Sequence, residues 1–206
     1  MVKYIFFFVS FFCVFCVAGT KLVDNHTFED FCENDLDNRL YQAVESNDYQ
    51  EFSHLLSNGA RPYTVYEDGI SLLHVAAIYA DSQIINELIL MDLDINMESD
   101  EGETPLTYAI TNFNRDAVLT LIENGASLLS VDEDGDSYLH IASMNNENAQ
   151  RHVTDDLSIL EIILRQLSGF IDIKNNEEKT PLDIARDHNN LEAVRILESW
   201  MLRLAD

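Results

Sequence analysis

The sequence predicts an all-α solenoid built from about five helix-turn-helix units. A six-residue motif occupies residues 71–76 and recurs 33 residues later at 104–109 and again at 137–142. A fourth copy follows after 43 residues, at 180–185, and a degenerate copy lies 33 residues before the first, at 38–43. A fixed period of this length indicates stacked supersecondary units, each of which contacts only its neighbours.

Two columns of identical residues support the alignment of the five copies. One column is leucine, at Leu40, Leu73, Leu106, Leu139 and Leu182. The other is alanine, at Ala43, Ala76, Ala109, Ala142 and Ala185. The aligned units cover residues 34–66, 67–99, 100–132, 133–175 and 176–206, and together they form one repeat domain, 34–206.

Residues 1–19 have the features of a secretory signal peptide. Lys3 precedes an uncharged run at residues 4–17, and the small residues Ala18 and Gly19 follow it. The run is shorter than the roughly 20 residues of a spanning helix. We expect cleavage after Ala18 or Gly19, with an uncleaved anchor as the alternative. The mature chain is then secreted or lumenal, periplasmic if the source is bacterial, and free of the membrane.

An exposed leader is expected at residues 20–33. It contains the sequon Asn25-His26-Thr27, a glycosylation site if the source is eukaryotic. Cys13 and Cys16 would leave with the signal peptide, so Cys32 would be the only thiol of the mature chain. Cys32 either forms an intermolecular disulfide or is a buried small residue of the first unit.

Each unit is expected to contain two helices. The first helix of the array should begin near Asp35, with Asp37 or Asn38 as its cap. Apolar residues at spacings of three and four place one face of each second helix in the core. These residues are Phe52, Leu55 and Leu56, then Ile85, Leu88 and Ile89, then Val118, Leu121 and Ile122.

Acidic residues followed by glycine mark a tight turn before each later unit, as at residues 66–69, 99–102 and 131–135. A Ser or Thr follows each turn and can cap the next helix. Pro105 and Pro181 occupy first helical positions, where a missing amide hydrogen costs little.

This pattern resembles the ankyrin repeat, whose motif is Thr-Pro-Leu-His-x-Ala after a turn. Thr104-Pro105 and Thr180-Pro181 keep the opening pair, whereas His74 and His140 keep the histidine. The resemblance implies β-hairpin-like turns between units and histidine rings that bond backbone and tie the turn to its helix. It also implies that partners bind at the turns and at the concave face formed by the first helices.

Two irregular segments depart from the period. Ten extra residues fall near 145–154 in the fourth unit, where we expect a surface loop before a helix with Leu160, Ile163 and Leu164 in the core. The C-terminal helix ends in the apolar residues Trp200, Met201, Leu202 and Leu204. This end either folds back on the array or forms a contact site.

Composition and motifs exclude several functions. The chain has 37 acidic and 12 basic residues, which argues against binding nucleic acid or an anionic membrane. Asp132, Asp134 and Asp136 resemble the start of a calcium loop, but Gly135 is at position 4 rather than 6, and position 12 is Ser143. With no nucleophile, phosphate-loop or paired-carboxylate signature, we expect no metal, no cofactor and no enzyme activity.

The acidic residues gather in the inter-unit turns, at 67–68, 98–103, 132–136 and 177–178. Such a ridge either steers a basic protein partner or keeps the chain soluble. The candidate contact residues are Tyr66, Asp68, Tyr79, Asp100, Glu101, Phe113, Asp132 and Asp134, with Tyr63 as a further anchor. The sequence therefore predicts a protein-interaction module. The alternative is an assembly protein, a monomer or Cys32-linked dimer, that self-associates through Cys32 or the apolar C-terminal end.

Overall fold

A computed structural model describes residues 28–144 and 158–205 of the chain. Leu36–Asp206 form one compact unit, and Met1–Asp35 are grouped apart from it. The expected signal peptide, Asn25 and the insertion at 145–154 lie outside the described residues. Cys32 lies in a helix, but its side chain is also outside the described part.

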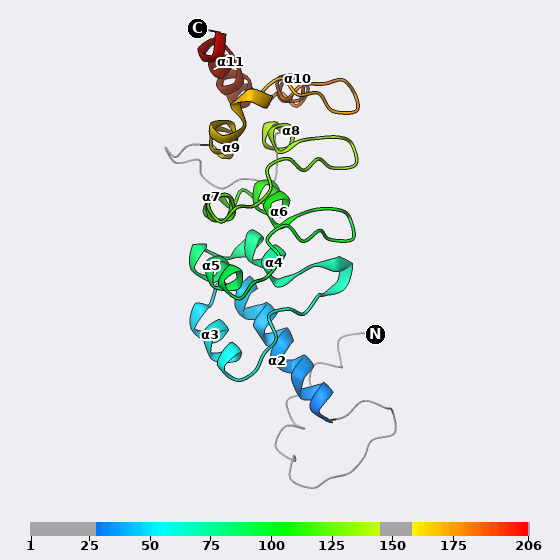
Figure 1. Ribbon diagram of the computed structural model, residues 1–206, viewed down its shortest axis with the longest axis vertical. Coiled ribbons are helices and arrows are strands. Elements are labelled where there is room, and N and C mark those ends of the chain that lie inside the picture. Colours follow the sequence, from blue (N-terminus) through cyan, green and yellow to red (C-terminus); the bar gives the residue numbers. More distant parts are fainter. Residues whose placement is uncertain (1–27, 145–157, 206) are drawn as a thin grey trace. The chain divides into compact units, whose positions relative to one another are not determined.

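The described helices between Leu36 and Ala205 are arranged in pairs. The pairs are α2 (Phe28–Glu45, from Leu36 on) with α3 (Tyr49–Ser57), α4 (Leu72–Tyr79) with α5 (Ser82–Leu90), α6 (Pro105–Thr111) with α7 (Arg115–Glu123), α8 (Tyr138–Ser143) with α9 (Ile159–Leu167), and α10 (Pro181–Asp187) with α11 (Leu191–Ala205). Two short 3-10 helices, Glu67–Gly69 and Ser168–Phe170, lie between pairs. Successive pairs stack in layers, with α4, α6 and α8 in one row and α5, α7 and α9 in another (Figure 1). The predicted all-α repeat solenoid is confirmed.

The core is built from the predicted columns. The column leucines are buried in every unit, and Phe52, Ile85 and Leu121 of the second helices are fully buried. Leu56, Ile89 and Ile122 are only partly buried, because they lie at the edge of the same apolar face. Each pair therefore leaves apolar surface that the next pair covers.

Ser or Thr caps start the first helices of units two to five, as the sequence predicts, and each cap forms a reciprocal capping box. In each capping box the side chain of the N-cap residue faces the third helical residue, whose side chain reaches back to the N-cap backbone. The N-cap residues are Ser71, Thr104, Ser137 and Thr180.

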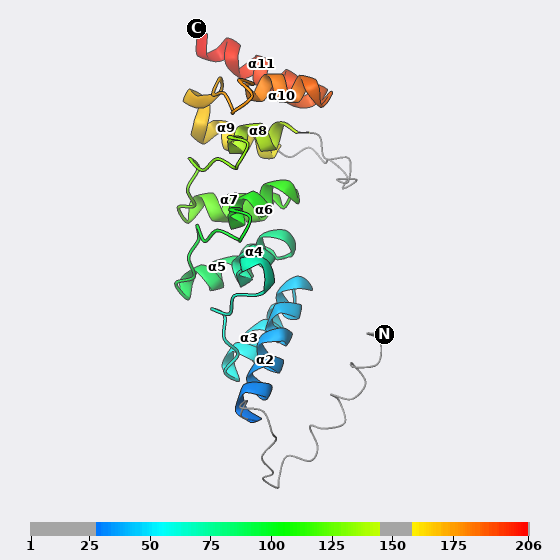
Figure 2. The ribbon, with the colours of Figure 1, turned by 90° about the vertical axis from the view of Figure 1, so that its right-hand side faces the viewer.

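Four tight loops, here called fingers, precede these caps. Finger 1 is residues 66–70, finger 2 is 99–103, finger 3 is 132–136 and finger 4 is 175–179. Each finger is closed by a backbone bond between its ends, such as Ser99 N–H to Glu103 O at 2.9 Å. They extend from one side of the helix stack and face the viewer in Figure 2. Antiparallel bridges flank fingers 1 and 3, which confirms their hairpin-like form.

The start of the first helix differs from the expectation. Helix α2 begins at Phe28, within the expected leader, so Asp37 and Asn38 both lie inside the helix and the prediction that one of them caps it is wrong. Asp37 is 2% exposed, and its carboxylate accepts from Arg61 N–H at 2.7 Å, from Arg61 Nε at 2.9 Å and from Thr64 Oγ1 at 3.1 Å. It ties the segment after α3 to α2, through partners that no local pattern indicates.

The two motif histidines join neighbouring units. His74 Nδ1 accepts from Ser71 N–H at 3.1 Å, which leaves Nε2 to donate to Glu103 O of finger 2 at 3.0 Å. His140 makes the same bonds to Ser137 and to Lys179 O of finger 4. The predicted bonds to backbone are confirmed, and each ring also reaches the finger of the following unit. Burial lowers the pKa of His74 and keeps its ring neutral.

We expect His74→Ala to destabilise the chain by about 2–4 kcal/mol, because it leaves the Ser71 N–H without its ring acceptor, removes the ring's bond to Glu103 O and empties a buried site. Urea unfolding followed by circular dichroism measures the change. The control is His54→Ala at an exposed position of α3, which should cost less than about 0.5 kcal/mol. Equal effects of the two substitutions would contradict the bridging role of the ring.

Candidate interaction surface

Exposed carboxylates occupy three consecutive fingers. We call this set the acidic surface; its members are Asp68, Asp100, Glu101, Asp132 and Asp134. Asp100 N–H donates to Asp68 O at 2.9 Å, so fingers 1 and 2 are in direct contact. The structure thus brings together the acidic residues that the sequence singles out.

Finger 4 differs because lysines neutralise its carboxylates. Lys179 Nζ lies 2.8 Å from Glu177 and 2.9 Å from Asp187, and Lys174 Nζ lies 3.0 Å from Glu178. Among the residues that the structure describes, no such ion pair involves the carboxylates of fingers 1 to 3. Arg115 is the only Lys or Arg in the sequence between Arg61 and Arg151. The negative field is therefore concentrated at the first three fingers.

Electrostatic repulsion is evident at finger 2. The pKa of Glu103 is raised by burial first, and then by the neighbouring charges of Glu101 and Asp132. A cationic group placed among these carboxylates would reduce their repulsion.

The aspartates of finger 3 stabilise the finger itself. Asp132 Oδ1 accepts from the backbone N–H of Asp134 at 3.0 Å and of Asp136 at 2.7 Å. Asp136 is buried and accepts from Asn175 Nδ2 at 2.6 Å. Within the described ranges, no group of three or more His, Cys, Asp or Glu residues is placed to hold a metal ion.

Tyr66 has a structural role in finger 1. Its hydroxyl donates to Asp37 O at 3.1 Å, and its ring meets Tyr41 edge-on, with centroids 4.9 Å apart. Burial, with the nearby Asp37, raises the pKa of the Tyr66 phenol. Tyr66 therefore fixes finger 1 to α2. Tyr63 is exposed, although its hydroxyl donates to Met91 O at 2.7 Å.

Tyr79 and Phe113 lie away from the acidic surface. Tyr79 ends the eight-residue helix α4, whose other end follows finger 1, so about 12 Å of helix separates them. Phe113 follows α6 in the same way, after finger 2. Both side chains are exposed, but the structure does not place them beside the acidic surface.

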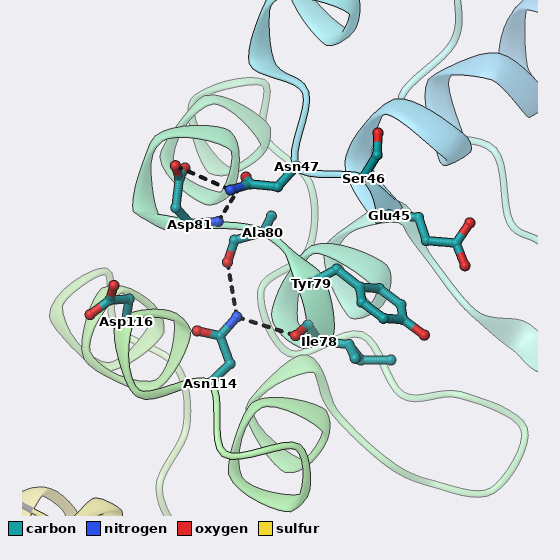
Figure 3. A pocket seen from close by; sticks show the side chains of 9 residues that line it. All are labelled: Glu45, Ser46, Asn47, Ile78, Tyr79, Ala80, Asp81, Asn114 and Asp116. Atoms are coloured by element: carbon teal, nitrogen blue, oxygen red, sulfur yellow. Dashed lines mark hydrogen bonds between the residues drawn. The ribbon is translucent and has the colours of Figure 1, made fainter. Parts of the chain in front are cut away.

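A polar cavity of about 280 Å³ lies near Tyr79, where the helix pairs connect. Its lining includes the acidic residues Glu45, Asp81 and Asp116. Figure 3 shows the Asn114 amide bonded to Ala80 O at 2.9 Å and the Asn47 amide directed at Asp81. These bonds join successive helix connections, so the cavity belongs to the packing between units.

Three exposed apolar residues near the acidic surface were not predicted from the sequence as candidate contact residues. Leu129 is 71% exposed and Val131 is 55% exposed, both just before finger 3, and Val65 is exposed before finger 1. Their sequence signal was weak, since they lie in the segments between helices and outside the repeated columns. They are nearer to the acidic residues in the chain than Tyr79 or Phe113.

Comparison with known proteins identifies the family. The model for ankyrin repeats (three copies) matches residues 40–132 and 73–157, which together exceed half of the chain. The chain belongs to the ankyrin-repeat family. Its repeats form a protein–protein interaction module, and the family is generally non-enzymatic.

The chain is similar to parts of several longer proteins that differ from one another. The transient receptor potential cation channel subfamily A member 1 of Homo sapiens is 27% identical over 165 residues, covering 76% of this chain and 14% of the relative. The nuclear factor NF-kappa-B p105 subunit of Rattus norvegicus is 30% identical over 139 residues, covering 64% and 13%. An ankyrin repeat protein of fowlpox virus is 32% identical over 142 residues, covering 66% and 39%. The chain thus spans well under half the length of each.

The helices of residues 28–144 and 158–205 include none with the length and apolar character needed to cross a membrane.

The contact between fingers 1 and 2 can be tested by substituting alanine for each of two glycines. A Cβ on Gly69 would lie 2.6 Å from Asp100 Oδ1 and 2.7 Å from Asp100 N, whereas one on Gly102 would meet nothing within 4 Å. Both residues have positive φ, so Gly→Ala costs roughly 1–2 kcal/mol at either site. We expect Gly69→Ala to cost more than Gly102→Ala in urea unfolding. Equal costs would show that fingers 1 and 2 do not press together.

The raised pKa of Glu103 predicts a pH-dependent gain from Glu103→Gln. A folded-state pKa above the unfolded value means that ionisation disfavours folding as pH rises through that window. The variant should therefore unfold at a higher temperature than the parent at pH 7, and the difference should shrink near pH 4. Glu123→Gln, at an exposed position of α7, serves as the control. A constant difference at all pH values would be inconsistent with this cause.

Proposed function

We propose that this chain binds a basic protein segment through fingers 1 to 3. The observation that carries the proposal is the contrast between fingers. Carboxylates are exposed without ion pairs on the described fingers 1 to 3, whereas finger 4 is neutralised by Lys174 and Lys179. A surface kept acidic only for solubility would not need this uneven distribution.

Both the charge and the exposed apolar area of this surface support the proposal of a protein partner. The net charge of −25 disfavours nucleic acid, and ankyrin-repeat proteins bind other proteins. Leu129 and Val131 supply exposed apolar area next to finger 3, so a basic segment with apolar residues fits best. Tyr66 is held in place within finger 1, because its hydroxyl donates to Asp37 O.

The test begins with affinity capture by the mature chain and identification of the bound protein. Binding of that protein is then compared between two triple variants by calorimetry. Asp100→Lys, Glu101→Lys and Asp134→Lys together should weaken binding roughly 10- to 100-fold, because each creates like-charge contacts with a basic partner. None of these side chains makes a hydrogen bond or ion pair among the described residues, so folding should survive.

The matched control is Glu45→Lys, Asp116→Lys and Glu123→Lys. It changes the net charge equally but lies on α2 and α7, away from the fingers. Binding should stay within about threefold of the parent. If both triple variants lose affinity to the same extent, only the net charge matters and the proposed surface is wrong.

We further propose that the chain acts in the secretory pathway, which rests on the features of residues 1–19. The mature N-terminus should begin at Gly19 or Thr20, and Asn25 should carry a glycan in a eukaryotic cell. N-terminal sequencing of the mature protein and treatment with an endoglycosidase test both points. A mature protein that still begins at Met1 would overturn the proposal.

Self-association is a second candidate, favoured by the end of α11. Leu202 is 71% exposed and Leu204 is 52% exposed, although Trp200 and Met201 pack against the core. Contact between copies through these leucines, or through Cys32, would cover apolar surface. Sizing and non-reducing electrophoresis of the mature chain distinguish these routes. A monomer in both measurements would rule out self-association.

A further inference from the structure

Exposed apolar side chains recur at matching positions of the segments that lead into fingers 1 and 3. Tyr63 and Val65 precede finger 1, and Leu129 and Val131 stand two repeat periods later, before finger 3. All four side chains are more than half exposed. One exposed apolar residue is ordinary, but here the same two positions are apolar in both segments. We call Tyr63 with Val65, and Leu129 with Val131, the apolar pairs.

The backbone of these segments fixes which side chains face outward. Alternate side chains of an extended chain point to opposite sides. Before finger 3, Leu128 packs against the core, whereas Leu129 is exposed. Val65 and Val131 each form an antiparallel bridge to the serine that caps the next helix. Both apolar pairs are therefore presented to solvent by ordered backbone.

Hydrogen bonds across the unit junctions hold the segments together. Tyr63 OH donates to Met91 O at 2.7 Å, which fixes its exposed ring against the next unit. Ser127 N–H donates to Asn96 Oδ1 at 2.7 Å, so the segments before fingers 2 and 3 lie side by side. A side chain that is already fixed loses little conformational freedom when a partner covers it.

The segment between the two apolar pairs is polar and acidic. One period after Tyr63 and Val65 stand Asn96 and Glu98, which are both exposed, and Asp100 follows in finger 2. The three segments lead into fingers that stack along one side of the array (Figure 1). In array order, the outward side chains are thus apolar before finger 1, acidic before finger 2 and apolar before finger 3.

The spacing of units determines which chain conformation can follow this order. Packed helices lie about 8–10 Å apart, which places the apolar pairs about 16–20 Å apart. A polyproline II segment advances about 3.1 Å per residue with three residues per turn, so that positions i, i+3 and i+6 share one face. A β-strand turns position i+3 to the opposite face, and an α-helix needs about 12 residues to span the same distance.

We propose that the partner segment binds in the polyproline II conformation, with apolar residues at positions i and i+6 and a basic residue at i+3. The apolar residues cover the two apolar pairs, and the basic residue faces Glu98. Charge complementarity places the basic residue, and the apolar contacts at both ends supply affinity. This inference rests on the proposed function, because it specifies the basic segment that fingers 1 to 3 would bind.

Three short synthetic peptides test the proposal against the full chain, with fluorescence anisotropy as the measurement. Peptide 1 has two leucines six positions apart and a lysine midway between them. Peptide 2 has the same composition with its leucines three positions apart, and peptide 3 has serine in place of both leucines. Peptide 1 should bind at least about tenfold tighter than either of the others, because only its leucines reach both apolar pairs.

Substitutions in the chain test the same contacts. Val65→Ser with Leu129→Ser should weaken peptide 1 roughly tenfold or more and leave peptide 3 unchanged. The matched control is Leu204→Ser with Leu202→Ser in α11, whose exposed fractions are nearly the same, and it should have no effect. Glu98→Leu places an apolar residue one unit from each pair and should strengthen peptide 2 roughly tenfold. Circular dichroism of each variant checks that it is folded.

Equal binding of all three peptides would overturn this inference and leave the proposed function standing, since lysine alone would then account for affinity. Equal loss in the two double variants, or no gain of peptide 2 with Glu98→Leu, would also overturn it. If no peptide binds, the proposed function fails and this inference fails with it.

Discussion

Each helix pair in this chain carries apolar side chains toward its neighbours. The apolar face of a pair is therefore buried only when the next pair packs against it. The leucine column and the second-helix residues Phe52, Ile85 and Leu121 meet this requirement in successive units. The fingers and motif histidines add directional bonds to that burial. The stability of the array is thus distributed along the chain, and each interface has its own set of bonds.

Local features of this fold are predictable from sequence, because their partners lie within a few residues. The caps at Ser71 and Thr104, and the left-handed glycines of the fingers, follow from spacings of three or four positions. The role of Asp37 was mispredicted because its partners, Arg61 and Thr64, lie more than twenty residues away. No short-range pattern contains that information.

The candidate surface likewise contains residues whose positions are predictable from the sequence and residues whose positions are not. Its acidic residues were predicted as a group, because the period places them all in fingers. Tyr79 and Phe113 were grouped with them by chemistry alone, and helix length separates them. The neutralisation of finger 4 by Lys179 depends on side-chain reach, which a sequence does not show.

The carboxylates of fingers 1 to 3 are repeated at the spacing of packed helices, which is about 8–10 Å. The Debye length at physiological ionic strength is about 8 Å, and at 0.01 M salt it is about 30 Å. In dilute salt the three fingers therefore act on an approaching charge as one extended field. At physiological salt the field of each finger is largely screened at this spacing, so an approaching charge responds to the arrangement of the carboxylates as well as to their number.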